Sequence, residues 1–349
     1  MRSYQFDKYG APLRAVETET PAPTGTEVLV RVAACGVCHS DIHLWDGYFD
    51  LGDDRKADLS RSHSLPLTLG HEIVGVVEAI GDQASGANVG DRAVVYPWIG
   101  CGDCPACNSG GDHLCPRPHA LGVNADGGYA DHVMVPHPRF LYAYGDVDTP
   151  LACTYACSGI TAYGALKKVR SRAEGRSLLI IGAGGVGLAG LMIAQAMMDT
   201  TIIVADIDDA KLETARAAGA DHVINPTADG ARKELIGLTG GGANGAVDFV
   251  GSDRSAGFGM QALANGGMLI VVGLFGGSMK LSVPLLPLKN IMLGGSYVGS
   301  PEEMRELMDL VVAGKVKPLP VATRPLDQAD QTLRDLRDGK IVGRMVLQP

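Results

Sequence analysis

Six consecutive residues near the N-terminus concentrate groups that bind metals and move protons. The stretch Cys38-His39-Ser40-Asp41-Ile42-His43 holds a thiol, two imidazoles, a hydroxyl and a carboxylate. Cysteine sulfur and histidine nitrogen are preferred zinc ligands, and a catalytic zinc keeps one position of its tetrahedral shell open. Cys38 alone cannot form such a site, so its partners must come from elsewhere. The density of these groups predicts a catalytic metal site rather than a segment of core.

Two later segments can supply the missing ligands. Gly70-His71-Glu72 places an imidazole and a carboxylate between apolar runs, and Cys157 adds a second thiol. Two cysteines, one histidine and a water form a recognised catalytic zinc shell. A helix is expected to start near Pro150 and to carry Cys153 and Cys157 on one face, so either thiol could be the third ligand. Cys35-Gly36-Val37-Cys38 could instead be a redox pair, but it does not open a helix after a thioredoxin-like strand.

Four further cysteines form a second constellation with the spacing C-x2-C-x2-C-x7-C. They are Cys101, Cys104, Cys107 and Cys115. Four thiolates saturate a tetrahedral ion, so a zinc held here would be structural. An iron–sulfur cluster is the alternative for four cysteines. Glycine and proline between the ligands suit a knuckle that wraps one ion, which favours zinc. We therefore expect one catalytic and one structural zinc, the latter in a lobe of about residues 97–118.

The second half of the chain contains a dinucleotide-binding signature. An apolar strand at 177–181 leads directly into Gly182-Ala183-Gly184-Gly185-Val186-Gly187 and then into a helical stretch, 188–198. The glycines let the backbone approach a pyrophosphate at the helix N-terminus. Asp206 ends the next strand, 201–205, where a carboxylate accepts hydrogen bonds from ribose hydroxyls and repels a 2′-phosphate. The pattern predicts NAD rather than NADP as the cofactor.

Strand and helix patterns alternate after this signature and predict a doubly wound parallel sheet. Further strands are expected at 221–225, 246–250, 268–273 and 291–297, separated by helices at 209–219, 230–238 and 254–265. With the two strands already named, this gives the six strands of a full doubly wound sheet. The tail is expected to form helices at 301–313 and 326–338 and a strand at 341–347.

The N-terminal part shows a different pattern, with short strands and no regular alternation with helices. Short strands are expected at 27–33, 73–79, 92–96 and 127–135, with glycine and proline between them. Such strands suggest a partly open β-barrel. The polar segment 46–64 is expected to be a surface loop.

Composition excludes several classes of protein. A chain of 349 residues exceeds one ordinary core, so two domains are expected. A net charge of −9 without a basic stripe argues against a nucleic-acid partner. The sequence shows neither a signal-peptide apolar region nor a membrane-spanning run, so we expect no membrane partner and a cytoplasmic location. The eight cysteines then favour metal binding over disulfides.

Taken together, these motifs resemble the zinc-dependent medium-chain alcohol dehydrogenase family over essentially the whole chain. The resemblance implies a GroES-like β-barrel catalytic domain, residues 1–155 and 297–349, interrupted by a Rossmann NAD-binding domain, residues 156–296. It places the active site between the two domains. It also implies a homotetramer of the bacterial type, because the long lobe insert of dimeric animal members is absent.

The resemblance also assigns roles to individual residues. Cys157, not Cys153, matches the metal ligand, and Asp41 matches the residue that orients His71. Glu72 is implied to lie close to the metal. Ser40 and His43 match a proton relay that runs through a cofactor ribose hydroxyl, and Trp98 is the leading candidate for the substrate pocket. The implied cofactor contacts are His39, Gly182, Gly184, Gly185, Val186, Gly187, Asp206, Lys211, Val250, Val272, Gly273, Leu274, Val298 and Arg344.

The implied reaction is reversible hydride transfer between a small alcohol and NAD, which yields an aldehyde or a ketone. Three alternatives remain. A polyol dehydrogenase of the same superfamily commonly replaces the second thiolate by a carboxylate, and Cys157 argues against this. A zinc-free quinone or enoyl reductase would lack Cys38, His71 and Cys157 together. A non-enzymatic NAD- and zinc-binding protein would need neither a complete metal set nor a relay.

Overall fold

The chain folds into two units, and the first contains residues from both ends of the sequence. The computed structural model describes residues 1–341 and 343–349. Unit 1 comprises Met1–Tyr48, Asp58–Ile160 and Ser300–Pro349, and unit 2 comprises Phe49–Ala57 and Thr161–Gly299. The expected interruption of one domain by another is therefore present.

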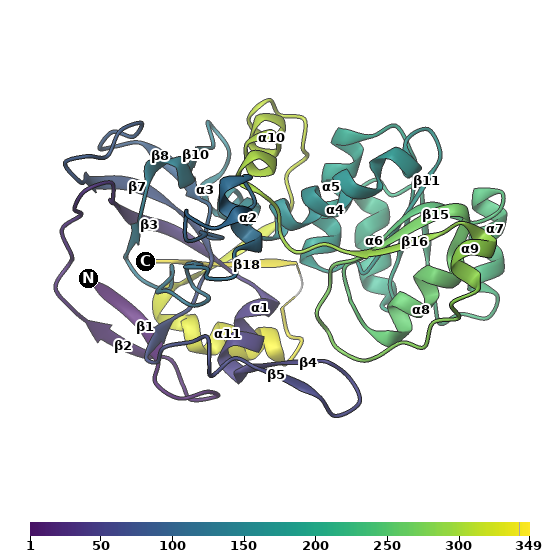
Figure 1. The fold of residues 1–349 in the computed structure, drawn as a ribbon, viewed down its shortest axis with the longest axis horizontal. Coiled ribbons are helices and arrows are strands. Elements are labelled where there is room, and N and C mark those ends of the chain that lie inside the picture. Colours follow the sequence, from purple (N-terminus) through teal and green to yellow (C-terminus); the bar gives the residue numbers. More distant parts are fainter. Residues whose placement is uncertain (342) are drawn as a thin grey trace. The chain divides into compact units, whose positions relative to one another are not determined.

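Unit 1 is built on β-sheets whose strands come from both ends of the chain (Figure 1). Its seven-stranded sheet has the order β10-β8-β7-β3-β18-β17, with β9 also paired to β3. These strands are β3 (Val28–Val37), β7 (Glu72–Ile80), β8 (Arg92–Val95), β9 (His132–Val135), β10 (Leu141–Ala143), β17 (Val321–Pro325) and β18 (Arg344–Gln348). A three-stranded sheet joins β1 (Arg2–Phe6), β2 (Arg14–Glu17) and β6 (Leu67–Thr68).

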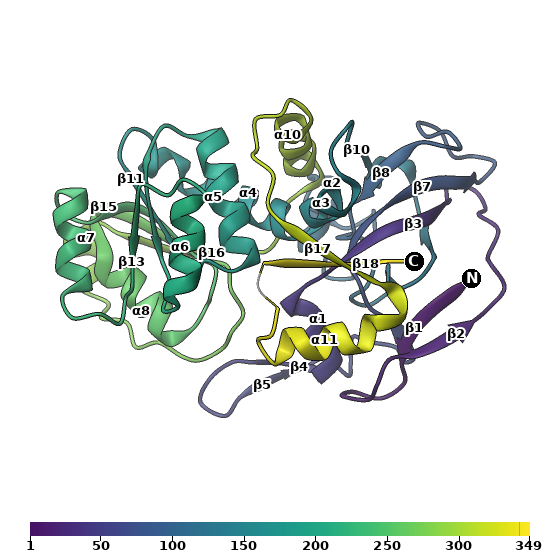
Figure 2. The same ribbon diagram turned by 180° about the vertical axis from the view of Figure 1, so that it is seen from behind.

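The helices of unit 1 are short and mostly flank these sheets. They are α1 (His39–Asp46), α2 (Pro105–Asn108), α3 (Thr149–Cys153), α10 (Pro301–Val312) and α11 (Ala329–Arg337), with 3-10 turns η1 (Asp112–Leu114), η2 (Pro138–Phe140), η3 (Thr154–Ala156) and η4 (Leu326–Gln328). On α11 the buried residues Ala329, Thr332, Leu333 and Leu336 recur at helical spacing and form one face. Helix α11 contacts α1, and Figure 2 shows the two side by side.

Unit 2 contains the predicted parallel sheet of six strands. Its order is β13-β12-β11-β14-β15-β16, and every neighbouring pair is parallel. The strands are β11 (Ser177–Ile181), β12 (Thr201–Ala205), β13 (His222–Ile224), β14 (Ala243–Asp248), β15 (Leu263–Val271) and β16 (Met292–Gly295). The order reverses between β11 and β14, which is where doubly wound sheets bind their ligands.

Helices connect these strands, as the alternating pattern predicts. They are α4 (Ser158–Ala173), which crosses the unit boundary, α5 (Gly185–Met197), α6 (Asp209–Ala217), α7 (Ala231–Thr239), α8 (Asp253–Ala262) and α9 (Leu285–Lys289). All five residues of β11 are buried, because helices cover a parallel sheet and its central strands meet no water. In the described part of the chain, no helix has the length and apolar composition needed to cross a membrane.

Two local expectations are wrong. The segment 46–64 is not a continuous loop, because β4 (Tyr48–Asp50) and β5 (Lys56–Asp58) pair within it. Asp53 and Asp54 make the turn with φ of 53° and 59°, a left-handed conformation that aspartate tolerates better than most residues.

The helix expected to carry both Cys153 and Cys157 does not exist. Helix α3 ends at Cys153, and Cys157, with φ −129° and ψ −72°, separates η3 from α4. The Cys153 thiol donates to the carbonyl of Pro150 at 3.1 Å. The two thiols therefore do not share one helix face, and Cys153 is engaged locally.

Candidate active site

Cys38, His71 and Cys157 converge in unit 1. One ligand atom from each lies within 4.8 Å of the others, and all three residues are buried. Strand pairing explains two of the three positions, because β3 and β7 are antiparallel neighbours with Gly36 opposite Glu72. Cys38 follows Gly36 by two residues and His71 precedes Glu72 by one, so the sheet brings them together.

The carboxylate of Asp41 fixes the orientation of His71. Asp41 is fully buried, and its Oδ1 lies 3.0 Å from Nδ1 of His71. Its Oδ2 accepts hydrogen bonds from the Cys38 N–H at 2.9 Å and the Tyr129 hydroxyl at 3.0 Å. Metal-binding histidines are commonly held by a carboxylate on the nitrogen that does not bind the metal.

The opposite nitrogen of His71 identifies the group this site can hold. Nε2 is buried and has no hydrogen-bond partner within residues 1–341 and 343–349. An orphaned imidazole nitrogen beside two thiols is the donor set of a tetrahedral zinc with one remaining position. The residues present therefore fit a catalytic zinc.

The electrostatics of the site favour a thiolate at Cys38. A hydrogen bond from the side chain of Cys157, assisted by His71, holds the pKa of Cys38 well below its usual range, although burial acts in the opposite direction. The thiolate is the form of cysteine that binds metals.

Glu72 and Arg344 form a buried ion pair beside this cluster. Nη2 of Arg344 contacts Oε2 of Glu72, and the Ser158 N–H donates to Oε1 at 3.2 Å. Burial raises the pKa of Glu72 to about 7, against the opposing effect of Arg344. A Cβ on Gly36 would lie 1.9 Å from Oε2 of Glu72, so a larger residue there would displace the carboxylate. No local pattern indicates this pair, since it depends on β18 lying beside β3.

The other predicted site residues of unit 1 lie on helix α1 or beside His71. Helix α1 carries His39, which is exposed, and Ser40 and His43, which are half-buried. Burial and, to a lesser extent, His39 lower the pKa of His43. Trp98 is buried, and its ring centroid lies 5.4 Å from that of His71. Its indole N–H donates to the Ala156 carbonyl at 3.1 Å, which fixes the ring beside the candidate ligand.

The four-cysteine lobe forms a second candidate metal centre. The four sulfur atoms lie within 4.8 Å of one another. Backbone N–H groups point at the sulfurs, from Cys101 to Cys115 at 3.2 Å and from Arg117 to Cys115 at 3.3 Å. The apolar cluster of the lobe consists of its own cysteines with Ala106. Such a lobe has little to order it except a bound ion, which fits a structural zinc.

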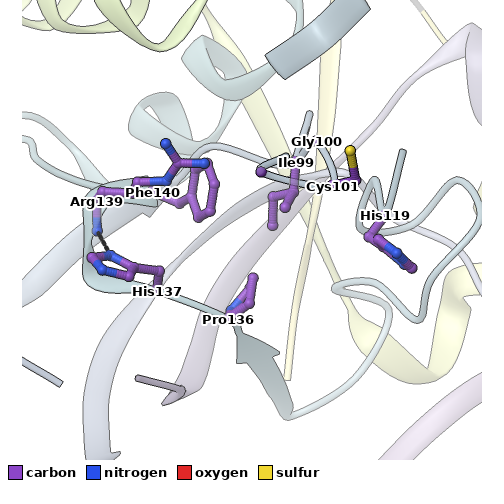
Figure 3. A pocket seen from close by; sticks show the side chains of 9 residues that line it. Ile99, Gly100, Cys101, His119, Pro136, His137, Arg139 and Phe140 are labelled. Carbon is purple, nitrogen blue, oxygen red and sulfur yellow. Dashed lines mark hydrogen bonds between the residues drawn. The ribbon is translucent and has the colours of Figure 1, made fainter. Parts of the chain in front are cut away.

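A shallow hollow of about 520 Å³ adjoins this lobe (Figure 3). It is lined by Ile99, Gly100, Cys101, Gly102, His119, Pro136, His137, Arg139 and Phe140. The Arg139 N–H donates to Nδ1 of His137 at 3.0 Å. Cys101 is the one predicted site residue in this lining, so the hollow is distinct from the Cys38, His71 and Cys157 cluster.

The glycine turn of unit 2 leaves open space at the N-terminus of α5. Gly182 has φ of 94°, and a Cβ on Gly187 would lie 1.8 Å from the Gly182 carbonyl oxygen. Gly184 is the N-cap of α5, and a Cβ there would meet no atom within 4 Å. The helix start is therefore open to an anion, which its N–H groups and dipole attract.

Asp206 follows β12 and is attached to this turn. Its Oδ2 accepts the Ala183 N–H at 2.7 Å and its Oδ1 accepts the Asp208 N–H at 3.0 Å. Each carboxylate oxygen keeps a free lone pair that a ribose hydroxyl can use. Among the other predicted contacts, Lys211 lies on α6, and the loops and segments that follow β14, β15 and β16 carry Val250, Val272, Gly273, Leu274 and Val298.

Comparison with known proteins agrees with this geometry. Residues 24–144 match the alcohol dehydrogenase GroES-like domain, and residues 185–313 match the zinc-binding dehydrogenase domain. The NAD-dependent alcohol dehydrogenase of Sulfurisphaera tokodaii is 39% identical over 351 residues, with 100% of each chain covered. The chain belongs to the zinc-dependent medium-chain alcohol dehydrogenase family.

Solved structures extend the comparison. The alcohol dehydrogenase of the hyperthermophilic archaeon Aeropyrum pernix aligns with a TM-score of 0.89 at 33% identity, with 100% of both chains covered. The D-arabinose dehydrogenase of Sulfolobus solfataricus aligns with a TM-score of 0.84 at 27% identity, again with 100% of both chains covered. A shared fold therefore does not fix the substrate.

The two constellations predict two zinc ions per chain, one in each donor set. Cys157→Ala should remove the ion of the first set and leave the lobe ion in place, because the lobe has its own four ligands. Cys104→Ala should mainly lower the temperature of unfolding, since the binding free energy of a closed site contributes directly to folding. Elemental analysis and thermal unfolding of the purified variants measure both effects. Iron in place of zinc, or one ion per wild-type chain, would contradict the assignment.

Proposed function

We propose that this chain catalyses reversible hydride transfer between a small alcohol and NAD, using the cluster of Cys38, His71 and Cys157. The observation that carries the proposal is this convergence, in which Nδ1 of His71 lies 3.0 Å from Asp41 and Nε2 is buried without a hydrogen-bond partner in the described residues. When bound, zinc supplies a Lewis acid that makes an alcohol hydroxyl easier to deprotonate, and NAD supplies the hydride acceptor.

The residues of α1 are proposed to remove the alcohol proton. Ser40 and His43 are three residues apart on one helix and so lie on the same side of it, which supports a short relay from the site towards solvent. The lowered pKa of His43 keeps its imidazole neutral, and therefore able to accept a proton, at neutral pH.

Other residues are proposed to bind and orient the reactants. Trp98 is proposed to form an apolar wall for the alcohol, which favours aliphatic and aromatic alcohols over polyols. Its place beside His71 supports this role. Glu72 and Arg344 are proposed to balance charge next to the metal ligands, and Arg344 is proposed to contact the cofactor as well. The cofactor turn and Asp206 are proposed to hold the pyrophosphate and the adenosine ribose.

A substrate screen tests the proposal. Primary, secondary and aromatic alcohols and polyols are each supplied with NAD⁺ or NADP⁺, and formation of the reduced cofactor is followed by absorbance. We expect turnover of simple alcohols with NAD⁺. Turnover of polyols alone would favour a sugar-alcohol dehydrogenase of the same superfamily. Absence of turnover with every alcohol would count against an enzyme of this class.

Asp206 should determine cofactor choice. Asp206→Ala removes the ribose acceptor and the repulsion of a 2′-phosphate, so KM for NAD⁺ should rise about 10- to 100-fold while use of NADP⁺ improves relative to NAD⁺. Steady-state kinetics with both cofactors measure the change. Asp221 is a suitable control, because its carboxylate binds the Ile202 N–H at the opposite end of the same strand. Equal use of NAD⁺ and NADP⁺ by the wild type would refute the role of Asp206.

His43 should give alcohol oxidation a distinctive pH dependence. Because burial lowers its pKa, the imidazole of His43 is neutral and able to accept a proton at neutral pH. His43→Gln should therefore slow oxidation by about tenfold at mildly acidic and neutral pH, where other bases are scarce, and by less at alkaline pH. Added buffer base should partly restore the rate, and zinc content should not change. A pH–rate profile that overlays the wild type, without a buffer effect, would show that His43 is not in the relay.

The proposed assembly is a homotetramer. Strand β16 is an edge of the six-stranded sheet, and large apolar side chains are exposed on it and before it, including Met292, Leu288 and Phe275, which are 48%, 79% and 75% exposed. An apolar sheet edge is a site where another chain can bind, and this supports self-association. A cytoplasmic location is proposed as well, supported by eight cysteines that form no disulfide in the described part of the chain.

Sedimentation measurements test the assembly. The wild type should sediment as a tetramer, and Leu288→Asp should shift it to a smaller species by placing a charge in the proposed contact. Val89→Asp is a matched control, because Val89 is 64% exposed in unit 1. A monomeric wild type, or dissociation by the Val89 change alone, would be incompatible with this proposal.

A further inference from the structure

Asp248 is a fully buried carboxylate at the carboxyl end of β14. In the described residues no basic side chain pairs with it, and its contacts are instead hydrogen-bond donors. Oδ1 accepts the N–H groups of Val250 at 2.9 Å and Gly251 at 3.0 Å, and Oδ2 accepts the Ser255 hydroxyl at 2.8 Å. A buried carboxylate is tolerated only where such bonds replace water. The three bonds therefore fix the loop that follows β14.

The same residue also holds the loop that follows β15. The carbonyl oxygen of Asp248 accepts the N–H groups of Val272 at 2.8 Å and Gly273 at 3.1 Å. A Cβ on Gly251 would lie 1.7 Å from the Gly273 carbonyl oxygen, so the two loops touch backbone to backbone. The N–H groups of Phe275 and Gly276 also donate to the carbonyl oxygens of Val250 and Gly251, each at 3.1 Å.

Helix α8 is tied to the same carboxylate. Ser252 is its N-cap, and Ser252 and Ser255 exchange side-chain and backbone hydrogen bonds in a capping box. Because the Ser255 hydroxyl also donates to Asp248, the first turn of α8, the loop after β14 and the loop after β15 all meet at one residue. A carboxylate near a helix N-terminus is also favoured by the helix dipole.

This assembly lies against the glycine turn. A Cβ on Gly182 would lie 2.8 Å from Cγ2 of Val250, and one on Gly190 would lie 2.8 Å from the ring of Phe249. The order of the sheet reverses between β11 and β14, and ligands of doubly wound sheets bind outside the strand ends at that point. The loops that Asp248 holds therefore form one side of the proposed NAD site.

We propose that Asp248 is a positioning residue for NAD, which sets the separation between the loops 250–252 and 272–276 and the glycine turn. This inference rests on the proposed function, because it presumes that the turn binds NAD. Asp248 acts through the loops and does not itself touch the cofactor. Loss of its side chain removes the acceptor of the Val250 and Gly251 N–H groups and one acceptor of the Ser255 hydroxyl, so the loop 250–252 and the first turn of α8 are no longer held to the end of β14.

A set of variants separates this role from a merely structural one. Asp248→Leu keeps a similar volume and removes all three side-chain acceptor contacts, and Ser255→Ala removes one of them. Asp248→Asn keeps an oxygen for the two N–H groups and an amide that can donate to Ser255. Ser177→Ala is the matched control. The Ser177 hydroxyl on β11 donates to Asn244 on β14, and Asn244 lies at the end of β14 opposite to Asp248.

Fluorescence titration with NADH at a temperature well below unfolding measures the effect. Asp248→Leu should weaken NADH binding at least about tenfold and Ser255→Ala by about threefold, while Asp248→Asn and Ser177→Ala should bind within about twofold of the wild type. Zinc content should be unchanged in all four. If Asp248→Leu does not fold, the comparison of Ser255→Ala with Ser177→Ala carries the test.

Wild-type affinity in Asp248→Leu, or in Ser255→Ala if the former does not fold, would overturn the inference and leave the proposed function standing. Equal losses in Ser255→Ala and Ser177→Ala would also overturn it, because affinity would then follow general stability. Wild-type protein that binds NADH but oxidises no alcohol would refute the proposed function, while the same titrations would still decide the role of Asp248. Wild-type protein that does not bind NADH would overturn both.

Discussion

The contact between Asp41 and His71 is the interaction on which the metal site depends. A fully buried carboxylate is costly unless it is paired, and here Oδ2 accepts an N–H and a hydroxyl while Oδ1 lies 3.0 Å from Nδ1 of His71. Because Nδ1 of His71 lies on Asp41, Nε2 is the nitrogen left to bind a metal with the two thiols. The N-terminus of α1, the segment before β7 and the hydroxyl of Tyr129 are thereby held in one arrangement. Without Asp41, His71 could turn, and the donor set would lose its geometry.

In unit 2, buried carboxylates likewise hold segments of the chain in place by accepting hydrogen bonds. Asp206 accepts backbone N–H groups and attaches the second strand to the glycine turn. The carboxylate of Asp248 does the same for the loop after β14. In each case an acidic side chain at the end of a buried strand replaces water around itself with N–H groups of the chain. The position of a loop then depends on hydrogen bonds that are expensive to break in a buried environment.

The sequence predicted what local patterns encode and missed what distant contacts create. Six parallel strands follow from apolar runs separated by helical ones, and the donor sets follow from residue type and spacing. The break at Cys157 could not be foreseen, because periodicity alone continues a helix through it. The pair of Glu72 and Arg344 depends on β18 returning to β3, a contact between residues 272 positions apart. The role of Asp248 likewise depends on which strands are neighbours, which no short motif records.

The most direct test of the account is a crystal structure of the full chain with anomalous diffraction measured on both sides of the zinc absorption edge. The account predicts a zinc bonded to Sγ of Cys38, Sγ of Cys157 and Nε2 of His71, at about 2.3 Å for sulfur and about 2.0 Å for nitrogen, with Nδ1 of His71 still on Asp41. Absence of a zinc signal at these three residues would contradict it. A zinc bonded through Nδ1 of His71, with Asp41 displaced, would contradict it as well.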